Sequence, residues 1–304
     1  MKRLLLILFP FGLLSAPADS LPRRFDGRFA LHPGDTVVSL GDGNAEAMRR
    51  FGFLETSLQL TFPASQSRFR NMAWQADTVF QRQRPRNFGD LSTHLRDAGA
   101  SVIFMYFGRS EVIAERSQSD FINAYSALVT SLLPITERIV IVVPFPFEAP
   151  ASEHLPDLRP RNALLAEYAQ LMHTLSELHG IMIVDLFHAF RRSAKAGQRL
   201  TTDGIRLTEE SQRKVAKAIT ASMRLPWFEN DELRSAVTAR NQLWHRYWRP
   251  TNWAFLRGNR THVPSSRDHT NNARRWFPEE IDALVPLITA ADRKVAESGN
   301  HAHE

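Results

Sequence analysis

Four short groups of polar residues carry the side chains best suited to chemistry; three follow apolar runs, and the fourth comes late in the chain. The groups are Gly41–Asn44, Ala76–Asp77, Gly108–Glu111 and Asp203–Arg206. Brought together by a fold, they would supply four carboxylates, from Asp42, Asp77, Glu111 and Asp203. Paired carboxylates can act as acid and base on a glycoside, or bind a divalent cation. The simpler interpretation is structural: the aspartates accept hydrogen bonds from loop amides, and Asp203 pairs with Arg206.

Nucleophilic chemistry has weaker support in the sequence. The nearby side chains that carry a hydroxyl or an amide are Ser39, Asn44, Thr78 and Ser110, and none has a visible base. His188 follows an apolar run in VDLFHAF, and we interpret it as a surface or helix-start histidine. The remaining candidates, His245, His262 and His269, lack the short spacing of metal ligands. We therefore expect no metal and no cofactor.

Five apolar runs with β-branched character predict the strands that position these groups. They cover residues 36–40, 69–72, 101–107, 138–143 and 181–186. Several are apolar at successive positions, as strands buried on both faces of a parallel sheet are. Apolar residues at helical spacing predict helices over 119–133, 162–178 and 209–223. This alternation predicts a three-layer α/β sandwich with a mostly parallel sheet. In such sheets, sites form outside the carboxyl ends of the strands, where the four polar groups fall.

Three segments are predicted along the chain. The first is a secretory signal over 1–18: Lys2 and Arg3 precede an apolar run that ends at a small-residue cleavage site, Ala16–Pro17–Ala18. The run is too short to span a bilayer comfortably, so we expect no transmembrane segment after its removal and a secreted or periplasmic protein. The second segment, 19–225, holds the α/β pattern.

The third segment, 226–304, has a different composition. It contains five of the six tryptophans and no strand pattern. We interpret it as an extension packed on the main domain, with an amphipathic helix over 278–297. Trp244, Trp248 and Trp253 are either the apolar contacts that hold the extension in place or, less simply, a surface that stacks on sugar rings.

Composition excludes several classes of protein. The net charge is +6, and 43% of residues are hydrophobic, which is too many for a disordered chain. Loss of Lys2 and Arg3 with the signal would leave +4. Cysteine is absent, which excludes disulfides and thiolate chemistry. The basic residues form no block and accompany no nucleic-acid-binding motif, so we expect no nucleic-acid partner.

The four polar groups, in this order, resemble the motifs of the SGNH hydrolases, also called the GDSL esterase/lipase family. That family reads GDS after its first strand, a block like SGDT after the second, GxND after the third, and DxxH before its last helix. The resemblance covers about residues 34–225 and implies a flavodoxin-like α/β/α sandwich. The phrases RRFGFLETSLQ, FRNMAWQADTV and RPTNWAFLRGNRTH also resemble a secreted branch of this family from planctomycete-type bacteria, in which the motif serine is often absent.

All four name-giving residues of the family are replaced. Gly43 stands at the nucleophile position, Ala76 at the oxyanion glycine, Ser110 at the asparagine and Arg206 at the base, whereas Asp203 is retained. Glycine cannot form an acyl-enzyme, and an arginine keeps its proton at any working pH. By resemblance the pocket consists of Asp42, Gly43, Asn44, Ala76, Asp77, Gly108, Ser110, Glu111, Asp203 and Arg206.

We therefore expect a binding protein on a hydrolase frame, without the family's ester chemistry. The resemblance implies acylated or cell-surface carbohydrate as the partner. The alternative is an active esterase or carbohydrate-acting hydrolase with relocated catalytic residues. For Arg206 we expect a side chain that points into the cleft and locks it through an ion pair with Asp203.

Overall fold

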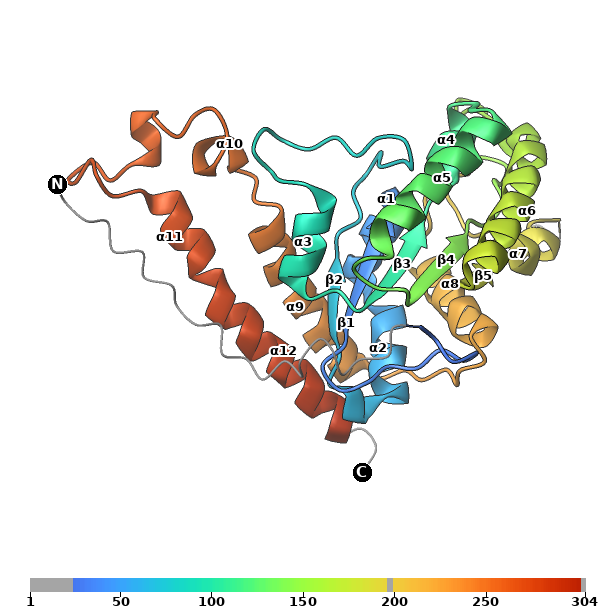
Figure 1. Cartoon of the computed structure of the whole chain (residues 1–304), viewed down its shortest axis with the longest axis horizontal. Helices are drawn as coiled ribbons and strands as arrows, with labels where there is room; N and C mark the ends of the chain where they lie inside the picture. The colour runs from blue at the N-terminus through green and yellow to red at the C-terminus, as the bar shows by residue number, and fades with distance from the viewer. Residues whose placement is uncertain (1–23, 196–198, 302–304) are drawn as a thin grey trace.

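The computed structural model describes residues 24–195 and 199–301, so the predicted signal lies outside it. Five strands form one parallel sheet in the order β2-β1-β3-β4-β5 (Figure 1). They are β1 Thr36–Gly41, β2 Arg68–Asn71, β3 Val102–Tyr106, β4 Ile139–Val143 and β5 Met182–Asp185. All five predicted strands are present, and the predicted three-layer α/β sandwich is confirmed.

Helices cover both faces of the sheet. Those of the sandwich are α1 Gly43–Phe51, α2 Phe53–Thr61, α3 Leu91–Ala98, α4 Arg109–Ile113, α5 Gln118–Leu132, α6 Asn162–His179, α7 Leu186–Lys195 and α8 Glu209–Ser222. Short 3-10 turns lie at Pro63–Ser65, Arg159–Arg161 and Pro264–Ser266. Three of the long helices match the predicted ranges within a residue or two. Thr208 caps α8 by accepting the amide of Ser211, as its position before the apolar pattern indicates.

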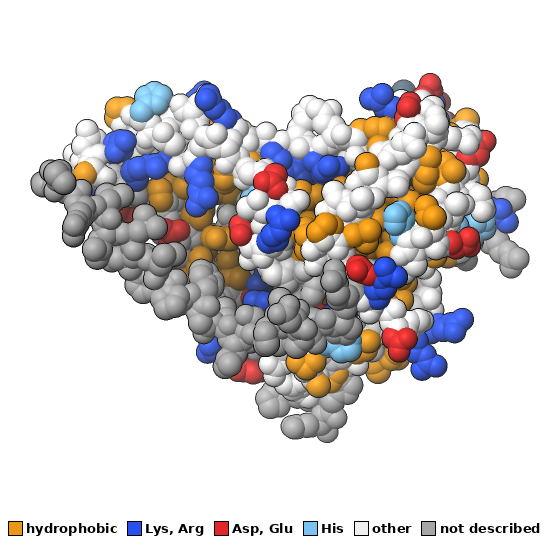
Figure 2. Space-filling model, in the orientation of Figure 1, with side chains coloured by type: hydrophobic (Ala, Val, Ile, Leu, Met, Phe, Trp, Pro, Cys, Tyr) orange, Lys and Arg blue, Asp and Glu red, His pale blue; other side chains and the backbone are white. Residues whose placement is uncertain are grey.

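The C-terminal segment is helical and packs against the sandwich. Its helices are α9 Asp231–Trp248, α10 Trp253–Leu256, α11 Trp276–Asp282 and α12 Leu284–His301. Helix α9 contacts β2, α1 and α2, and α12 packs alongside α9. The outline is notched where α10 and α11 extend beyond the sandwich (Figure 2). The single helix predicted over 278–297 is instead two, α11 and α12, which meet at Ala283.

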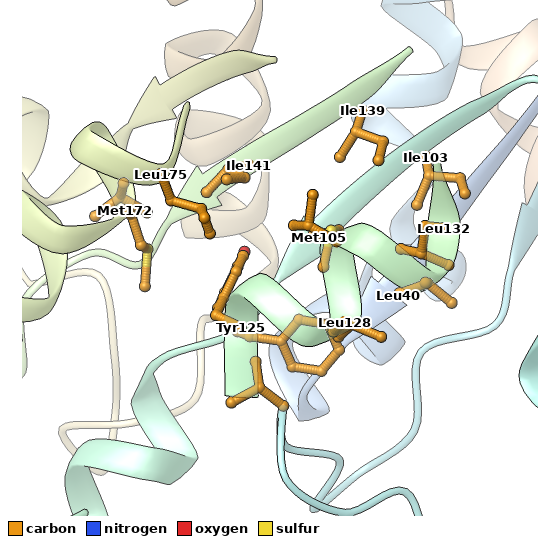
Figure 3. Packing of buried hydrophobic residues seen from close by; sticks show 14 of the residues in the cluster. Leu40, Ile103, Met105, Tyr125, Leu128, Leu132, Ile139, Ile141, Met172 and Leu175 are labelled. Atoms are coloured by element: carbon orange, nitrogen blue, oxygen red, sulfur yellow. The ribbon is translucent and has the colours of Figure 1, made fainter. Parts of the chain in front are cut away.

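Alternate strand residues feed two apolar cores, one on each face of the sheet. Leu40, Ile103 and Met105 point to the face covered by α5 and α6, where Tyr125 and Met172 meet them (Figure 3). Val37, Phe104 and Val142 point to the opposite face, where α2, α7 and α8 pack. This alternation is the period of two expected of strands buried on both sides.

Three tryptophans of the C-terminal segment, Trp244, Trp248 and Trp253, serve packing. Trp248 is buried in the first core, edge-on to Trp74 and Phe88, and the ring of Trp253 packs on Phe88. Trp244 is partly buried beside the same core. Of the two interpretations of these tryptophans, the packing one therefore fits their contacts. Within 24–195 and 199–301, no helix is long and apolar enough to cross a membrane.

Candidate functional site

The strand order puts a topological switch point at β1. Strand β1 has β2 on one side and β3 on the other. The connections that follow β1 and β3 therefore run to opposite sides, and a crevice forms between them at the carboxyl ends of the strands. The groups after β1, β2 and β3 all lie at this edge of the sheet. The 203–206 loop joins them there, because Asn44 hydrogen bonds to its backbone.

Residues after β1 build a helix start at the family's nucleophile position. The Asp42 carboxylate caps α1 by accepting the amides of Asn44 (2.9 Å) and Ala45 (3.4 Å). Gly43 is the first residue of α1. Asn44 donates to the carbonyl of Ile205 (3.1 Å) and accepts the amide of Leu207 (3.1 Å). Asp42 and Asn44 are thus committed to backbone groups, and Gly43 offers no side chain.

Arg109 is the residue that sequence reasoning missed. Its guanidinium is buried between the rings of Phe145 and Phe147, 4.1 and 4.3 Å from their centroids. It donates to the carbonyl of Phe145 (2.7 Å) and to those of Gly204 and Ile205 (both 3.3 Å). Burial lowers the pKa of Arg109 to about 10, against the charges of Asp42, Glu148 and Asp203. Through its bonds to Gly204 and Ile205, Arg109 therefore holds the loop that carries Asp203 in place. Its only sequence signal is a long cation at the variable position of the third motif.

The Glu111 side chain links the loop after β2 to the loop after β3. Its carboxylate is buried and accepts the amides of Val79 and Gly108, both at 2.8 Å. Gly108 has φ = 125°, and a Cβ there would lie 2.7 Å from Met172, so only glycine fits. Ser110, the residue before Glu111 in α4, is half-buried. Burial raises the pKa of Glu111 to about 7, more than the two amides lower it.

This raised pKa predicts a pH dependence of stability. Between pH 4.5 and 7 native Glu111 keeps its proton while the unfolded chain loses it, so the free energy of unfolding falls as pH rises. The contribution is about 3 kcal/mol over that window, at about 1.4 kcal/mol per pH unit. Urea unfolding of the wild type and of Glu111→Gln from pH 4 to pH 8 checks this. The variant should lack this part of the slope; equal slopes in both proteins would refute the assignment.

The loop after β2 lines an open pocket of about 510 Å³. Asp77 forms a two-pronged ion pair with Arg84, both distances being 2.7 Å. Arg84 and Arg249 lie over the Trp74 ring, 4.5 and 3.7 Å from its centroid. The lining residues are Trp74, Gln75, Ala76, Asp77, Thr78, Phe80, Gln81, Gln83, Arg84, Pro85, Glu111, Ala114 and Arg116. Basic side chains gather around the notch near this loop (Figure 2).

Ala76, at the position where the resemblance implies a glycine, has a backbone conformation typical of glycine. Its φ is 68°, in the left-handed region that non-glycine residues seldom adopt. The turn around it is closed by the bond from the Asp77 amide to the Trp74 carbonyl (3.0 Å). Ala76 therefore holds a backbone conformation that glycine adopts more readily than alanine.

Arg206 does not plug a cleft. The predicted pair with Asp203 forms, with Nε 2.6 Å from Oδ2, but 83% of the Arg206 side chain is exposed to solvent. The Asp203 carboxylate also accepts hydrogen bonds from the amides of Ile205 (2.9 Å) and Arg206 (2.7 Å). Burial raises the pKa of Asp203, but these two bonds and the Arg206 guanidinium lower it more, so the pKa lies below its usual range. The prediction that Arg206 points inward is wrong: two loop amides hold the Asp203 carboxylate, whose side chain is 14% exposed, and the Arg206 side chain extends from it into solvent.

Replacement of Arg206 should consequently have a small effect. An ion pair open to water contributes at most about 1 kcal/mol, so Arg206→Ala should lower the free energy of unfolding by less than that. Asp203→Ala should cost more, because it also leaves two loop amides without their acceptor. Thermal melts of both variants measure the two effects. A loss above about 2 kcal/mol in Arg206→Ala would contradict the exposed geometry.

Five of the ten predicted pocket residues line one of two separate pockets, and the other five, Gly43, Gly108, Ser110, Asp203 and Arg206, line neither of these two. Ala76, Asp77 and Glu111 line the open pocket. Asp42 and Asn44 line a small apolar cavity of about 30 Å³ beside Arg109. The four carboxylates each have amide or guanidinium partners, and among residues 24–195 and 199–301 they form no group spaced to hold one cation. This favours the structural interpretation of the carboxylates.

His188 lies away from this pocket. It is on α7 after β5, and its Nδ1 is 2.6 Å from the Asp185 carboxylate. Strands β1 and β5 are separated by β3 and β4, which places them about 14 Å apart at 4.8 Å per strand. An imidazole at β5 is therefore not positioned as a base for the crevice beside β1.

No protein-family model and no curated protein matches the chain. Solved structures do. One is a putative GDSL-like lipase from Parabacteroides merdae, with a TM-score of 0.53 and 17% identity over 65% of this chain and 99% of that one. Another is a catalytic mutant of an acetylxylan esterase from Geobacillus stearothermophilus, with a TM-score of 0.54 and 16% identity over 66% and 100%. The chain has an SGNH/GDSL hydrolase-like fold.

A third solved structure, an α/β hydrolase from the metagenome of Lake Arreo, Spain, gives a TM-score of 0.51 with 18% identity over 64% of this chain and 97% of that one. At these identities the likeness concerns the SGNH-like fold alone. It agrees with the strand order 2-1-3-4-5 and with the position of the polar groups at the carboxyl edge. What the site does depends on the residues present in this chain.

Proposed function

We propose that this protein is a non-catalytic carbohydrate-binding member of the SGNH-like fold. The observation that carries the proposal is the lining of the 510 Å³ pocket, where the described residues include no His, Ser, Cys or Lys. Its one hydroxyl, on Thr78, is bonded to Gln81, and its Asp77 carboxylate is held by Arg84. A nucleophile with a base beside it is what ester hydrolysis by this kind of site requires.

The side chains that remain suit a saccharide. Gln75, Gln81 and Gln83 are exposed amides, which both donate and accept hydrogen bonds. Arg116 is exposed beside Phe80, 5.1 Å from its centroid, and makes no ion pair with another described residue. Two similar structures are an acetylxylan esterase and a GDSL-like lipase, so acylated polysaccharide is the ligand class that we propose.

The test is binding of acetylated xylo-oligosaccharides by titration calorimetry. Arg116→Ala and Gln81→Ala should each weaken binding about 5- to 10-fold, the value of one or two hydrogen bonds. Gln170→Ala, an exposed glutamine on α6, is the matched control and should bind like the wild type. If the wild type does not bind these saccharides, or if pocket variants bind unchanged, this ligand assignment is wrong.

The proposal also places the protein outside the cytoplasm. It rests on the segment Lys2–Ala18, with its basic start, apolar run and small-residue end. N-terminal sequencing of the protein from its native cells should give Asp19 as the first residue. An intact N-terminus recovered from the cytosol would contradict export.

A further inference from the structure

Two histidines and an aspartate meet at the outer end of the sheet, on elements unrelated to the pocket. His173 is on α6, Asp185 ends β5, and His188 is in the first turn of α7. The Oδ2 atom of Asp185 lies 2.7 Å from Nε2 of His173 and 2.6 Å from Nδ1 of His188. All three atoms lie within 4.8 Å of one another, and no other such group occurs in the part of the chain that the structure describes.

The backbone fixes this arrangement. Asp185 pairs with Val143 in the sheet, and α6 packs on β5 and β4. The second oxygen of Asp185 accepts the amide of His188 (2.9 Å), which orients the carboxylate toward both imidazoles. Such a bond to the far oxygen is the kind of outer contact that orients metal ligands.

We propose that His173, Asp185 and His188 bind one Zn²⁺ ion. Two imidazoles and one carboxylate are three of the four ligands of a tetrahedral zinc site, with water in the fourth position. The mixed nitrogen and oxygen set disfavours Ca²⁺ and Mg²⁺, which prefer oxygen alone. The fourth position faces solvent, since 57% of the His188 side chain and 34% of that of His173 are exposed.

Only small movements separate the observed contacts from a bound ion. With zinc–ligand distances of about 2.0–2.2 Å, neighbouring ligand atoms in a tetrahedron are about 3.3 Å apart. The two contacts to Oδ2 must therefore open by about 0.6 Å, and the two imidazole nitrogens, which lie within 4.8 Å of each other, must also come to about 3.3 Å. Zinc binds the unprotonated nitrogen of a neutral imidazole, so each ring would carry its proton on the nitrogen that faces away from Oδ2.

This site is independent of the proposed carbohydrate site. It lies on α6, β5 and α7, and none of these elements contributes a residue to the lining of the 510 Å³ pocket. Zinc here would join α6, β5 and α7 and leave one coordination position open to a second ligand.

The experiment is a titration of chelator-stripped, full-length protein with Zn²⁺ against a chromophoric competitor. We expect one equivalent to bind, and Co²⁺ in its place to give the strong visible absorption of a tetrahedral site. His173→Gln and His188→Gln should each weaken Zn²⁺ binding about 100-fold, since outer-shell changes alone cost 10- to 100-fold. Two control variants, His154→Gln and the pair His301→Gln with His303→Gln, remove other imidazoles and should bind as the wild type does.

Thermal melts provide a second measurement on the same proteins. Zn²⁺ should raise the Tm of the wild type and of both controls, but not that of His188→Gln. Because 57% of the His188 side chain is exposed, this variant should keep the native fold, which circular dichroism checks. Absence of stoichiometric binding in the wild type would overturn the proposal. So would equal affinity in His188→Gln and the wild type, because the ion would then sit elsewhere.

Discussion

Replacement of Arg240 by methionine is expected to lower the free energy of unfolding by about 3–5 kcal/mol. Arg240 is on α9, with 1% of its side chain exposed, and it pairs with Glu55 of α2 and with Asp292 of α12. It also donates to the carbonyl of Phe69 in β2 (2.9 Å). Removing the guanidinium leaves Glu55 and Asp292 as buried charges with fewer partners, which is the costly way to break a buried ion pair.

Chemical denaturation of three variants measures this network. Arg246→Met, an exposed arginine on the same helix, is the control and should change stability by less than about 0.5 kcal/mol. Adding Glu55→Gln to Arg240→Met should restore part of the loss, because the uncompensated carboxylate is gone. If the free energy of unfolding of Arg240→Met equals that of Arg246→Met, the C-terminal helices are not held to the sandwich by this network.

The second large effect is on catalysis. The four changes Gly43→Ser, Ala76→Gly, Ser110→Asn and Arg206→His together should raise hydrolysis of p-nitrophenyl acetate about 100-fold above the wild-type background. This is a small part of the ~10⁶ that an intact triad supplies. The wild type and the single variants Gly43→Ser and Arg206→His should show no turnover, because each lacks either the nucleophile or the base.

The local geometry accepts the changes at positions 43 and 76. A Cβ at Gly43 would lie 3.6 Å from Gln75, an ordinary contact, and Gly43 is not in the left-handed region. Glycine at position 76 suits φ = 68° better than alanine does. Adding Asp203→Ala to the quadruple variant should remove the gained activity. A folded quadruple variant without activity would mean that the loop braced by Arg109 does not admit an ester.

The strands and most of the long helices follow from local patterns in the sequence. Runs such as 138–143 are apolar at every position, and β4 is accordingly buried on both faces. The boundary inside 278–301 was not visible, because apolar residues continue at helical spacing across Ala283 while the backbone ends one helix and begins another.

The sequence predicts where the site residues lie in the fold better than it predicts which groups their side chains contact. Strand ends locate Asp42, Ala76 and Glu111 at one edge of the sheet, but sequence does not say which partners they take. Arg109 was missed because a buried arginine depends on three carbonyls and two rings from distant segments. The inward orientation of Arg206 was wrong for a similar reason, since two loop amides decide how Asp203 is turned.

The most direct test of the central claim follows a bound saccharide over time. Acetylated xylo-oligosaccharide is mixed with the wild-type protein, and bound ligand and free acetate are measured together by NMR. The account predicts saturable binding with the acetyl groups intact after many hours. Acetate released by the wild type, at a rate lost on Asp203→Ala or Ser110→Ala, would contradict it and establish an active esterase with relocated chemistry.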